Sequence, residues 1–405
     1  MTTNAGDLAL DFVVPRYGQS VVGGAETLCR MFAVHLTRAG ARVRVLTTCA
    51  VDHFMWADAL PPGITIEEGV EVHRYPVGPR NHDQWSALHA EIARGQRVDY
   101  ADELLWMANS VWAQGILDAV GGSQAGDWTI AMPYLFGTTF WTVVARPTRS
   151  IVFPCLHDEA HARARVVRTA LASSRGLFFN STGERDLART IIGSLPTRCG
   201  DISACPVIGV GYEERPIPST DEVRAFTSRH GLTPGYLLYA GRREIGKGVP
   251  DLYRAYRAYR QATDRPRPLV LVGSGELPVP DDLIPHVVDL GFVDHTDMAV
   301  AYAGAFLLVH PSRMESLGLV LLEAWLAGTP VLVTAHSPVL VEHCTASGGG
   351  LWWANPAEFA EAVLMLEESP NTHDHLAIAG REYVMERFRW AAVGEHLIDS
   401  IAALA

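Results

Sequence analysis

The sequence predicts an α/β protein made of two doubly wound units, each a parallel sheet flanked by helices. Short apolar strands alternate with amphipathic helices in the first half, a polar stretch interrupts them, and the alternation then restarts. At 405 residues the chain is long enough for two domains with separate cores. Two such units imply a central cleft, with ligands bound outside the carboxyl ends of the strands.

The first unit opens with a predicted strand at residues 8–15, a helix at 25–40 and a second strand at 42–48. Strand, helix and strand in this order predict a parallel pair with a right-handed crossover. Gly40 is a candidate cap at the end of the helix. The apolar face of this helix recurs at i, i+3, i+4, i+7 and i+8 and consists of Leu28, Met31, Phe32, His35 and Leu36.

The rest of the first half continues the pattern, and the segment 80–128, rich in Trp and Ala, predicts helices. Its further predicted strands lie at 129–133, 150–154, 176–180 and 206–210. Residues 211–222 are polar, contain two prolines and show no periodicity, which is typical of an interdomain linker. The first domain is therefore placed at residues 1–210 and the second at 223–388.

The second domain repeats the alternation of strands and helices. Helices are expected to begin near residues 249 and 318. The predicted strands lie at 236–240, 268–273, 305–310 and 330–334.

Composition narrows the function classes. The net charge of −12 is spread without basic runs, which argues against nucleic acid and against a Lys/Arg face on anionic membranes. No apolar stretch reaches the roughly 20 residues of a membrane span and no signal peptide is evident, so a cytoplasmic enzyme is expected, with peripheral membrane contact left open. The six cysteines form no CxxC pair, which disfavours zinc, and pairing of Cys199 with Cys205 is left open.

The loop after the strand 236–240 carries two cations. Gly241 allows a tight turn, and Arg242 and Lys247 stand before a helix with Pro250 in its first turn. Two cations beside a helix N-terminus suit a diphosphate, although a solvated basic turn explains this stretch equally well.

A second glycine turn, with Gly273 and Gly275, follows the strand 268–273 in the sequence VGSGE. The third glycine of a dinucleotide fingerprint is missing, which counts against a nicotinamide site.

The apolar run at residues 311–333 contains two carboxylates, Glu315 and Glu323. Ser316 is placed to cap a helix over residues 317–327, so that Glu315 precedes the helix and Glu323 lies inside it. Glu323 has apolar neighbours one helical turn away, so its carboxylate needs donors such as vicinal hydroxyls. The alternative is a buried glutamate bonded to neighbouring backbone or to an arginine.

The same helix start offers free backbone N–H groups for hydroxyls or phosphate oxygens. They belong to residues such as Leu317, Gly318 and Leu319. Gly318 would also allow a ligand to approach the backbone closely.

Two loops of the first half are further candidates. Gly23 and Gly24 precede the first helix and can approach a phosphate or sugar, or form a plain tight turn. His157 and Asp158 follow the strand 150–154 and are candidates to contact an acceptor or reacting sugar, with a structural histidine as the alternative. No GxSxG, HExxH or P-loop motif is present, which disfavours serine hydrolases, zinc proteases and NTPases.

In this order, the motifs GG-x-E, GR-x4-KG, VGSGE, GFVD at 291–294 and E-x7-E resemble those of the retaining glycosyltransferases of family 4. The resemblance spans nearly the whole chain and implies the GT-B fold, in which two Rossmann-like domains face a central cleft. It implies that residues 1–210 bind the acceptor and 223–388 the nucleotide sugar. It further implies that a last helix, at about 389–405, completes the first domain.

The resemblance also implies residue roles. Arg242 and Lys247 would neutralise the donor diphosphate, and Glu315 would contact the donor sugar. Glu323 would hold the ribose, and His157 would lie near the transferred sugar. Further donor contacts are implied around the glycine loops, the helix start and the base, at Gly23, Gly24, Gly241, Gly273, Gly275, Phe292, Val293, Ser316, Leu317, Gly318 and Leu319.

The implied reaction moves a sugar from a nucleoside-diphosphate sugar to an acceptor hydroxyl with retention, in polysaccharide, glycoconjugate or natural-product biosynthesis. No protein nucleophile, cofactor or metal is required, because side-chain cations replace the metal ion. The acceptor would be a small molecule or glycan. Asp158 is a candidate to bind it. A tryptophan platform with Trp85, Trp106, Trp112 and Trp128 is another candidate, with core packing of each ring as the alternative.

Two alternatives remain at this point. A nucleotide-sugar epimerase of similar fold would rearrange the donor without an acceptor. A non-catalytic sugar-nucleotide-binding partner is the other, although the presence of both cations and both carboxylates argues against it.

Overall fold

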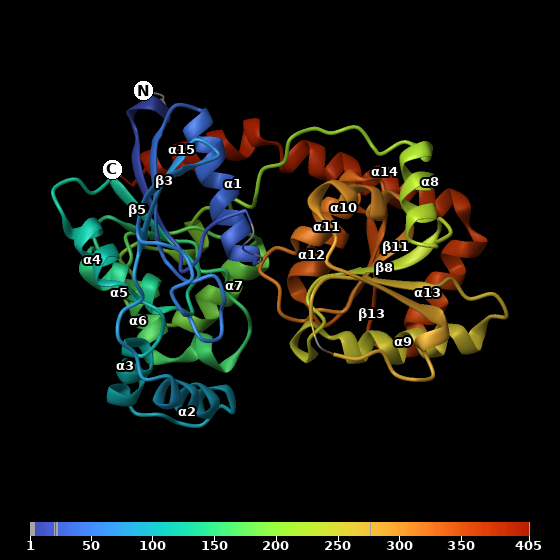
Figure 1. The fold of residues 1–405 in the computed structure, drawn as a ribbon, viewed down its shortest axis with the longest axis horizontal. Coiled ribbons are helices and arrows are strands. Elements are labelled where there is room, and N and C mark those ends of the chain that lie inside the picture. The colour runs from blue at the N-terminus through green and yellow to red at the C-terminus, as the bar shows by residue number, and fades with distance from the viewer. Residues whose placement is uncertain (1–4, 20, 22, 276, 405) are drawn as a thin grey trace. The chain divides into compact units, whose positions relative to one another are not determined.

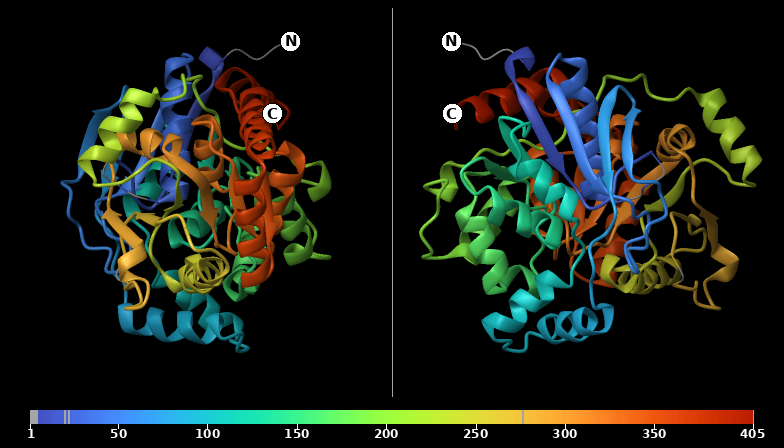
Figure 2. Two further views of the ribbon diagram at one scale, coloured as in Figure 1. Left: turned by 90° about the vertical axis from the view of Figure 1, so that its right-hand side faces the viewer. Right: turned by 60° about the vertical axis from the view of Figure 1, so that its left-hand side comes forward.

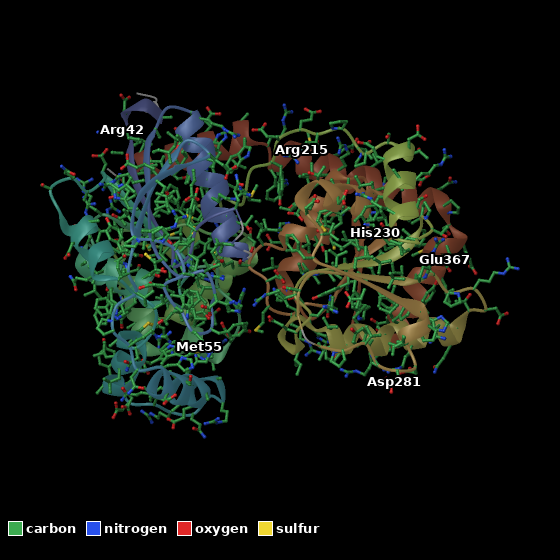
Figure 3. All side chains as sticks on the ribbon, in the orientation of Figure 1. Arg42, Met55, Arg215, His230, Asp281 and Glu367 are labelled. Carbon is green, nitrogen blue, oxygen red and sulfur yellow. The ribbon has the colours of Figure 1, made fainter. Side chains whose placement is uncertain are left out.

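The computed structural model describes residues 5–19, 21, 23–275 and 277–404. The chain divides into two compact units, one of Met1–Tyr212 with Trp390–Ala405 and the other of Glu213–Arg389 (Figure 1). Each unit is an α/β unit with helices packed against a sheet (Figure 2). Exposed side chains such as Arg42, Met55 and Asp281 can be located in Figure 3.

The sheet of the first unit has the strand order β3-β4-β2-β1-β5-β6-β7, with β1 near its centre. All neighbouring strands are parallel except β3 and β4, which pair antiparallel. The strands are β1 (Ala9–Val13), β2 (Arg42–Thr48), β3 (Gly63–Glu67), β4 (Val70–Tyr75), β5 (Trp128–Ala131), β6 (Ser150–Val152) and β7 (Gly176–Leu177).

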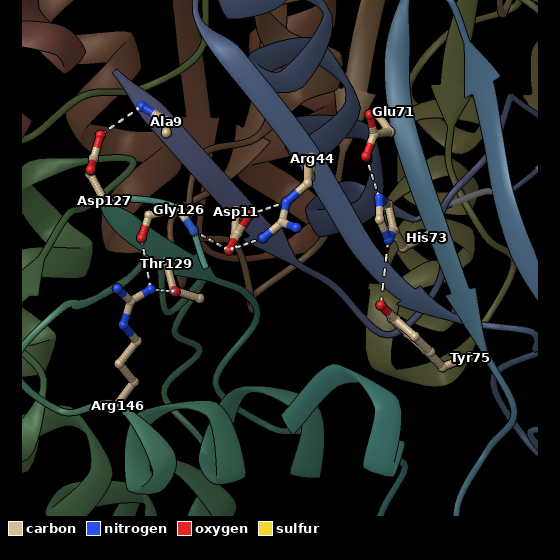
Figure 4. Close-up of polar contacts among 10 residues, drawn as sticks. All are labelled: Ala9, Asp11, Arg44, Glu71, His73, Tyr75, Gly126, Asp127, Thr129 and Arg146. Atoms are coloured by element: carbon tan, nitrogen blue, oxygen red, sulfur yellow. Dashed lines mark hydrogen bonds and ion pairs between the residues drawn. The ribbon is translucent and has the colours of Figure 1, made fainter. Parts of the chain in front are cut away.

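A buried ion pair ties three segments of this sheet together. Asp11, on β1, accepts two hydrogen bonds of 2.8 Å from Arg44 on β2 and one of 2.7 Å from the backbone N–H of Gly126 (Figure 4). The carboxylate is buried, and a buried charge is stable when it is paired and fully hydrogen-bonded. Asp11 therefore fixes the entry of β5 beside β1.

The helices of the first unit lie between or after its strands. They are α1 (Gly24–Arg38), α2 (His82–Ala93), α3 (Tyr100–Ala108), α4 (Gln114–Gly121), α5 (Gly137–Ala145), α6 (Arg165–Ser173), α7 (Thr182–Ile192) and α15 (Trp390–Ala402), with short 3-10 turns η1 (Ala5–Asp7), η2 (Ala160–Arg163) and η3 (Ile202–Ala204). The C-terminal α15 packs on α1, where Trp390 stacks on His35 at 4.1 Å between ring centroids. The adjacent Gly394 allows this approach, because a Cβ there would lie 2.6 Å from the His35 ring.

The second unit holds a sheet of six parallel strands in the order β10-β9-β8-β11-β12-β13. The strands are β8 (Tyr236–Ala240), β9 (Leu269–Val272), β10 (Val287–Gly291), β11 (Ala305–His310), β12 (Val331–Thr334) and β13 (Gly350–Trp353). Numbered within the unit, this order is 3-2-1-4-5-6, that of a doubly wound dinucleotide-binding sheet. The order reverses between β8 and β11, which is where such sheets bind ligands.

Helices cover the second sheet, and its central strands are buried on both sides. All residues of β8, β9 and β12 are buried, which explains why they read as continuous apolar runs. The helices are α8 (Thr220–Arg229), α9 (Val249–Ala262), α10 (His295–Ala303), α11 (Leu319–Leu326), α12 (Pro338–Ser347), α13 (Pro356–Glu368) and α14 (Pro370–Arg387), with 3-10 turns η4 (Ile245–Lys247) and η5 (Ile284–His286).

Three secondary-structure expectations need correction. The strand expected at 206–210 is reduced to a single bridge between Val207 and Phe179. The expected linker is partly helical, because α8 begins at Thr220, where Ser219 and Glu222 form a capping box. Four strands were missed. The edge strands β3, β10 and β13 are less buried and give weaker apolar patterns, and the interior strand β4 alternates buried with partly buried residues instead of forming an apolar run.

Within the described part of the chain, no helix is both long and apolar enough to cross a membrane.

Candidate functional site

Three loops meet at the carboxyl edge of the second sheet, after β8, β9 and β11. The loops after β8 and β9 pack backbone against backbone, with Arg243 N–H donating to the Ser274 carbonyl at 2.7 Å. A Cβ on Gly273 would lie 2.1 Å from the Gly241 carbonyl oxygen, and a Cβ on Gly248 would lie 2.3 Å from that of Pro311. These loops therefore form one continuous wall.

The glycines of this wall have a structural reason that the sequence did not reveal. Gly273 and Gly275 both have positive φ, and a Cβ on Gly275 would lie 2.6 Å from the Arg243 carbonyl oxygen. Any side chain there would clash with the loop after β8. The absence of a side chain at these glycines is thus required for the two loops to pack together, whether or not a ligand also approaches them. Glu276, the last residue of the VGSGE motif, lies outside the described residues.

Lys247, Glu315 and His310 form a hydrogen-bonded cluster in this wall. Lys247 ends η4, Glu315 lies between β11 and α11, and their Nζ and Oε1 atoms are 2.8 Å apart. His310, the last residue of β11, is buried, and its Nε2 lies 3.2 Å from the same Oε1. The side chains of Lys247 and Glu315 are 26% and 14% exposed, so the cluster is shielded from solvent yet reachable.

The charges of this cluster keep Glu315 ionised. Burial alone would raise the pKa of the Glu315 carboxyl, but Lys247 and His310 hold it well below its ordinary value. His310 was missed by sequence reasoning, although a polar residue ending a buried strand was a signal available in AFLLVH. Within the described residues its Nδ1 is a buried atom with no hydrogen-bond partner.

Arg242 lies in the same loop and pairs with another carboxylate. Its Nη1 is 3.0 Å from Glu244 Oε1, and both side chains are partly exposed. Its backbone carbonyl accepts a hydrogen bond of 2.7 Å from the Tyr239 hydroxyl, which fixes the start of the loop. Each cation that the sequence singled out thus has a carboxylate partner, and an anionic ligand would compete with Glu244 for Arg242.

Glu323 lies inside α11, as expected. Its hydrogen-bond partner was not expected. The Tyr302 hydroxyl, from α10, donates to Glu323 Oε2 at 2.9 Å. The alternative of a glutamate satisfied by backbone or arginine is therefore wrong in its choice of partner. Burial raises the pKa of Glu323 to about 7 even though the Tyr302 hydrogen bond opposes it.

The start of α11 differs from the expectation. The helix begins at Leu319, and the residue before it, Gly318, adopts φ 81° and ψ 56°. Ser316 is therefore not the N-cap, because the left-handed turn at Gly318 redirects the chain into the helix two residues later. Ser316 and Leu317 lie in the preceding loop, and Gly318 is also needed sterically, since a Cβ would lie 2.7 Å from Leu340 Cδ2.

The loop after β10 carries the residues that the family resemblance places near the base. Phe292 is an exposed large apolar side chain and Val293 is partly buried. The Phe292 side chain is 68% exposed, so its ring is accessible to a planar ligand.

The first unit presents Gly23 and Gly24 at the start of α1. Glu26 folds back over this start, so that a Cβ on Gly23 would lie 2.1 Å from its carboxylate. The same carboxylate pairs with buried Arg16, whose Nε lies 3.0 Å from Oε1. Around Gly24 no described atom would come within 4 Å of a Cβ, so it remains open to a ligand. Ser20 and Val22 of the same loop lie outside the described residues.

His157 and Asp158 follow β6, but they differ in surroundings. Asp158 is 68% exposed and pairs with Arg163 at 2.6 Å. His157 is 34% exposed, and its Nδ1 lies 4.0 Å from Glu159 Oε1. Glu159, which sequence reasoning did not single out, also accepts a hydrogen bond from the Tyr134 hydroxyl. Burial alone would raise the pKa of the Glu159 carboxyl, but its hydrogen bonds with His161 and Tyr134 lower it.

The four tryptophans considered as an acceptor platform are engaged in packing. Trp106 and Trp128 are core residues, and Trp85 stacks on His89 at 4.5 Å. Trp112 packs against Gly78, where a Cβ would lie 2.7 Å from its ring. These rings are used in packing, which was the alternative considered for each.

The cysteines are free thiols. The Cys199 thiol interacts with that of Cys205, and this interaction lowers the pKa of Cys199 to about 7. Among the described residues, no three His, Cys, Asp or Glu side chains are grouped as they would be to hold a metal ion.

Comparison with known proteins places this geometry in a family. Residues 222–383 match the model of the glycosyl transferases group 1, and these residues include the whole wall of loops. The chain is 34% identical to glycogen synthase of Mycobacterium tuberculosis, over 93% of this chain and 90% of the relative. It is 28% identical to D-inositol 3-phosphate glycosyltransferase 1 of Catenulispora acidiphila, over 87% and 84%.

Solved structures share the fold. Sucrose-phosphate synthase from Thermosynechococcus elongatus aligns with a TM-score of 0.71 at 18% identity, over 98% of this chain and 99% of that one. Anabaena HepE in complex with UDP-glucose aligns with a TM-score of 0.67 at 16% identity, over 98% and 100%. The expected α/β, GT-B fold is thereby confirmed, and the chain belongs to the glycosyl transferases group 1 family.

Proposed function

We propose that this glycosyltransferase moves a hexosyl unit from a nucleoside-diphosphate sugar to an acceptor hydroxyl, with retention at the anomeric carbon and without a metal ion. The observation that carries the proposal is the cluster of Lys247, Glu315 and His310 beside Arg242, at the point where the order of the second sheet reverses.

The two cations would hold the donor diphosphate. Lys247 has three N–H donors, so it can keep its bond to Glu315 and still bind a phosphate oxygen. Arg242 would exchange Glu244 for the diphosphate, which offers it two charge-assisted hydrogen bonds. Ionised Glu315 would accept hydrogen bonds from hydroxyls of the donor sugar, and Glu323 from those of the ribose. The loop with Phe292 and Val293 would border the base.

In the proposed step, the acceptor oxygen bonds to the anomeric carbon on the face from which the diphosphate departs. The bond between that carbon and the phosphate oxygen breaks, and the departing phosphate takes the acceptor proton. Arg242 and Lys247 stabilise the charge that develops on the phosphate. His157 of the first unit would contact the transferred sugar, and Asp158 would contact the acceptor.

The donor and the acceptor are open to direct test. The structure of HepE was solved with UDP-glucose, which makes UDP-glucose the first donor to try. The names of the two sequence relatives point to different acceptors, glycogen and D-inositol 3-phosphate, and both classes belong in the screen. The names of the relatives do not favour an epimerase or a non-catalytic partner.

The decisive experiment incubates the protein with UDP-, ADP- and GDP-linked sugars and these acceptors. Mass spectrometry follows release of nucleoside diphosphate and gain of one hexose by the acceptor, and NMR of the product reports anomeric retention. Conversion of the donor to an isomer would instead identify an epimerase.

A matched pair of variants tests the site. We expect Lys247→Ala to lower kcat by about 100-fold or more, the scale of removing one preorganised charge-stabilising group. Arg254→Ala removes an exposed cation from the helix that follows the same loop and is expected to keep full activity. Normal turnover by Lys247→Ala would refute the assignment of the donor site.

A further inference from the structure

A strained residue lies two positions before His157. Cys155 adopts φ 52°, a left-handed conformation that side chains with a Cβ rarely take. It follows the end of β6 and is buried, so its conformation sets the direction in which the chain leaves the sheet toward His157. Such strain persists where surrounding contacts hold it, and it clusters at functional sites.

Glu184, from the first turn of α7, provides those contacts. Its Oε1 accepts from the Leu156 N–H at 2.7 Å, and its Oε2 accepts from the Asn180 N–H at 2.7 Å. The N–H of Cys155 also points to this carboxylate. A residue with positive φ can turn successive N–H groups toward one acceptor, and here the acceptor is the carboxyl of Glu184 from the same chain.

Burial of the Glu184 carboxyl costs free energy, so the contacts that this residue makes must offset that cost. Its side chain is 1% exposed, and burial raises its pKa to about 8 despite the backbone N–H groups that oppose this shift. Asn180 adds a contact of 3.6 Å from Nδ2 to Cys155 Sγ. The start of α7 and the segment 155–156 are therefore locked together next to His157.

We propose that Glu184 is a positioning residue for His157, acting through the backbone of Cys155 and Leu156. The inference rests on the proposed function insofar as His157 contacts the transferred sugar. Glu184 itself touches neither substrate nor reacting atoms. It holds the segment whose next residue is His157, and a shift of about 1 Å at a reacting group is enough to cost rate on the order of 100-fold.

The chain contains a matched control. Glu103 is also a buried carboxylate that bridges two segments, accepting from the Val166 N–H at 2.9 Å and from Arg165 at 3.2 Å. It caps the start of α6 instead of the segment 155–156. Glu103→Gln and Glu184→Gln thus each remove a buried carboxyl. They differ in the backbone segment that loses its hydrogen-bond acceptor, which is the start of α6 for Glu103 and the segment 155–156 for Glu184.

The test measures kcat, the KM for the donor and the NMR titration of the His157 ring in wild type and both variants. We expect Glu184→Gln to lower kcat by about 10-fold or more with the donor KM unchanged, and to shift the His157 titration. Glu103→Gln should leave all three unchanged. Adding Cys155→Gly to Glu184→Gln should restore part of kcat. Glycine adopts a φ near 52° without steric strain, so this conformation no longer depends on the contacts of Glu184.

Equal effects of the two variants, or a His157 titration that Glu184→Gln does not move, would overturn the proposal. If Glu184→Gln does not fold, Glu184→Asp keeps the carboxyl group on a side chain one methylene shorter and is expected to act in the same direction. If the wild type transfers sugar from none of the donors, the proposed function is refuted. The NMR comparison then still decides whether Glu184 sets the surroundings of His157.

Discussion

Replacement of Glu323 by glutamine should remove a pH dependence of stability that the structure builds into the second unit. Glutamine keeps the shape and can still accept the hydrogen bond from Tyr302, but it has no proton to lose. Burial raises the pKa of Glu323 from an ordinary 4.5 to about 7. Between these pH values the folded state binds a proton that the unfolded state has released, so stability falls as pH rises.

The magnitude follows from this pKa difference. At about 1.4 kcal/mol for each pH unit, the wild type should lose about 3 kcal/mol of unfolding free energy between pH 4.5 and pH 7 through this group alone. The measurement is chemical denaturation of wild type and Glu323→Gln at a series of pH values, with amide exchange of the α11 peptides as a local probe. Because other groups titrate equally in both proteins, the difference between them isolates Glu323.

Relative to the wild type, the free energy of unfolding of Glu323→Gln should increase steadily from pH 4.5 to pH 7. Above pH 7 the difference between the two proteins should stay constant. Stability curves that stay parallel from pH 4.5 to pH 8 would refute the buried, raised-pKa carboxyl. The proposed function adds a ligand test, because a Glu323 carboxyl that holds the ribose should accept its hydroxyls more strongly when ionised. Affinity for UDP should fall below pH 7 in the wild type and change little in the variant.

Three further outcomes are expected. Gly273→Ala should destabilise the protein by about 2–4 kcal/mol in denaturant, because its Cβ would clash with the Gly241 carbonyl, whereas Gly121→Ala, on a helix with open surroundings, should cost nothing. The pKa of Glu315 is lowered, so the stability advantage of wild type over Glu315→Gln should be present above pH 4.5 and vanish on acidification; an advantage that persists in acid would contradict the ion pair. Iodoacetamide at pH 7.5 should label Cys199 before buried Cys29, because Cys199 is partly exposed with a thiol pKa of about 7; equal labelling by mass spectrometry would contradict this.

Local sequence patterns were sufficient to predict those strands that are buried on both faces. The strands β8, β9 and β12 and the last four residues of β11 are buried, and these strands read as apolar runs. The edge strands β3, β10 and β13 are partly exposed and the interior strand β4 alternates buried with partly buried residues, so none of the four is a buried apolar run. The start of α11 was misplaced because Ser316 obeys the usual capping preference, and a left-handed turn at Gly318 overrides it.

The partners of the candidate site could not be read from spacing. Tyr302 is 21 residues from Glu323, and Lys247 is 68 residues from Glu315, yet each pair is in hydrogen-bond contact. Glu184 reaches Leu156 across 28 residues. Which side chains meet depends on the order of the strands in the sheet, and a sequence pattern does not encode that order.

The sequence by itself determined the α/β class, the repeated strand–helix alternation and the residue types that suit a nucleotide sugar, because these depend on local periodicity and local chemistry. Tertiary structure alone decided that Glu315 is ionised by Lys247 and His310 while Glu323 is held near neutrality, since the two carboxyls differ in neighbouring charge and not in burial. It also decided that Gly273 and Gly275 are required between loops, because the steric limit comes from a backbone more than 30 residues away in the chain.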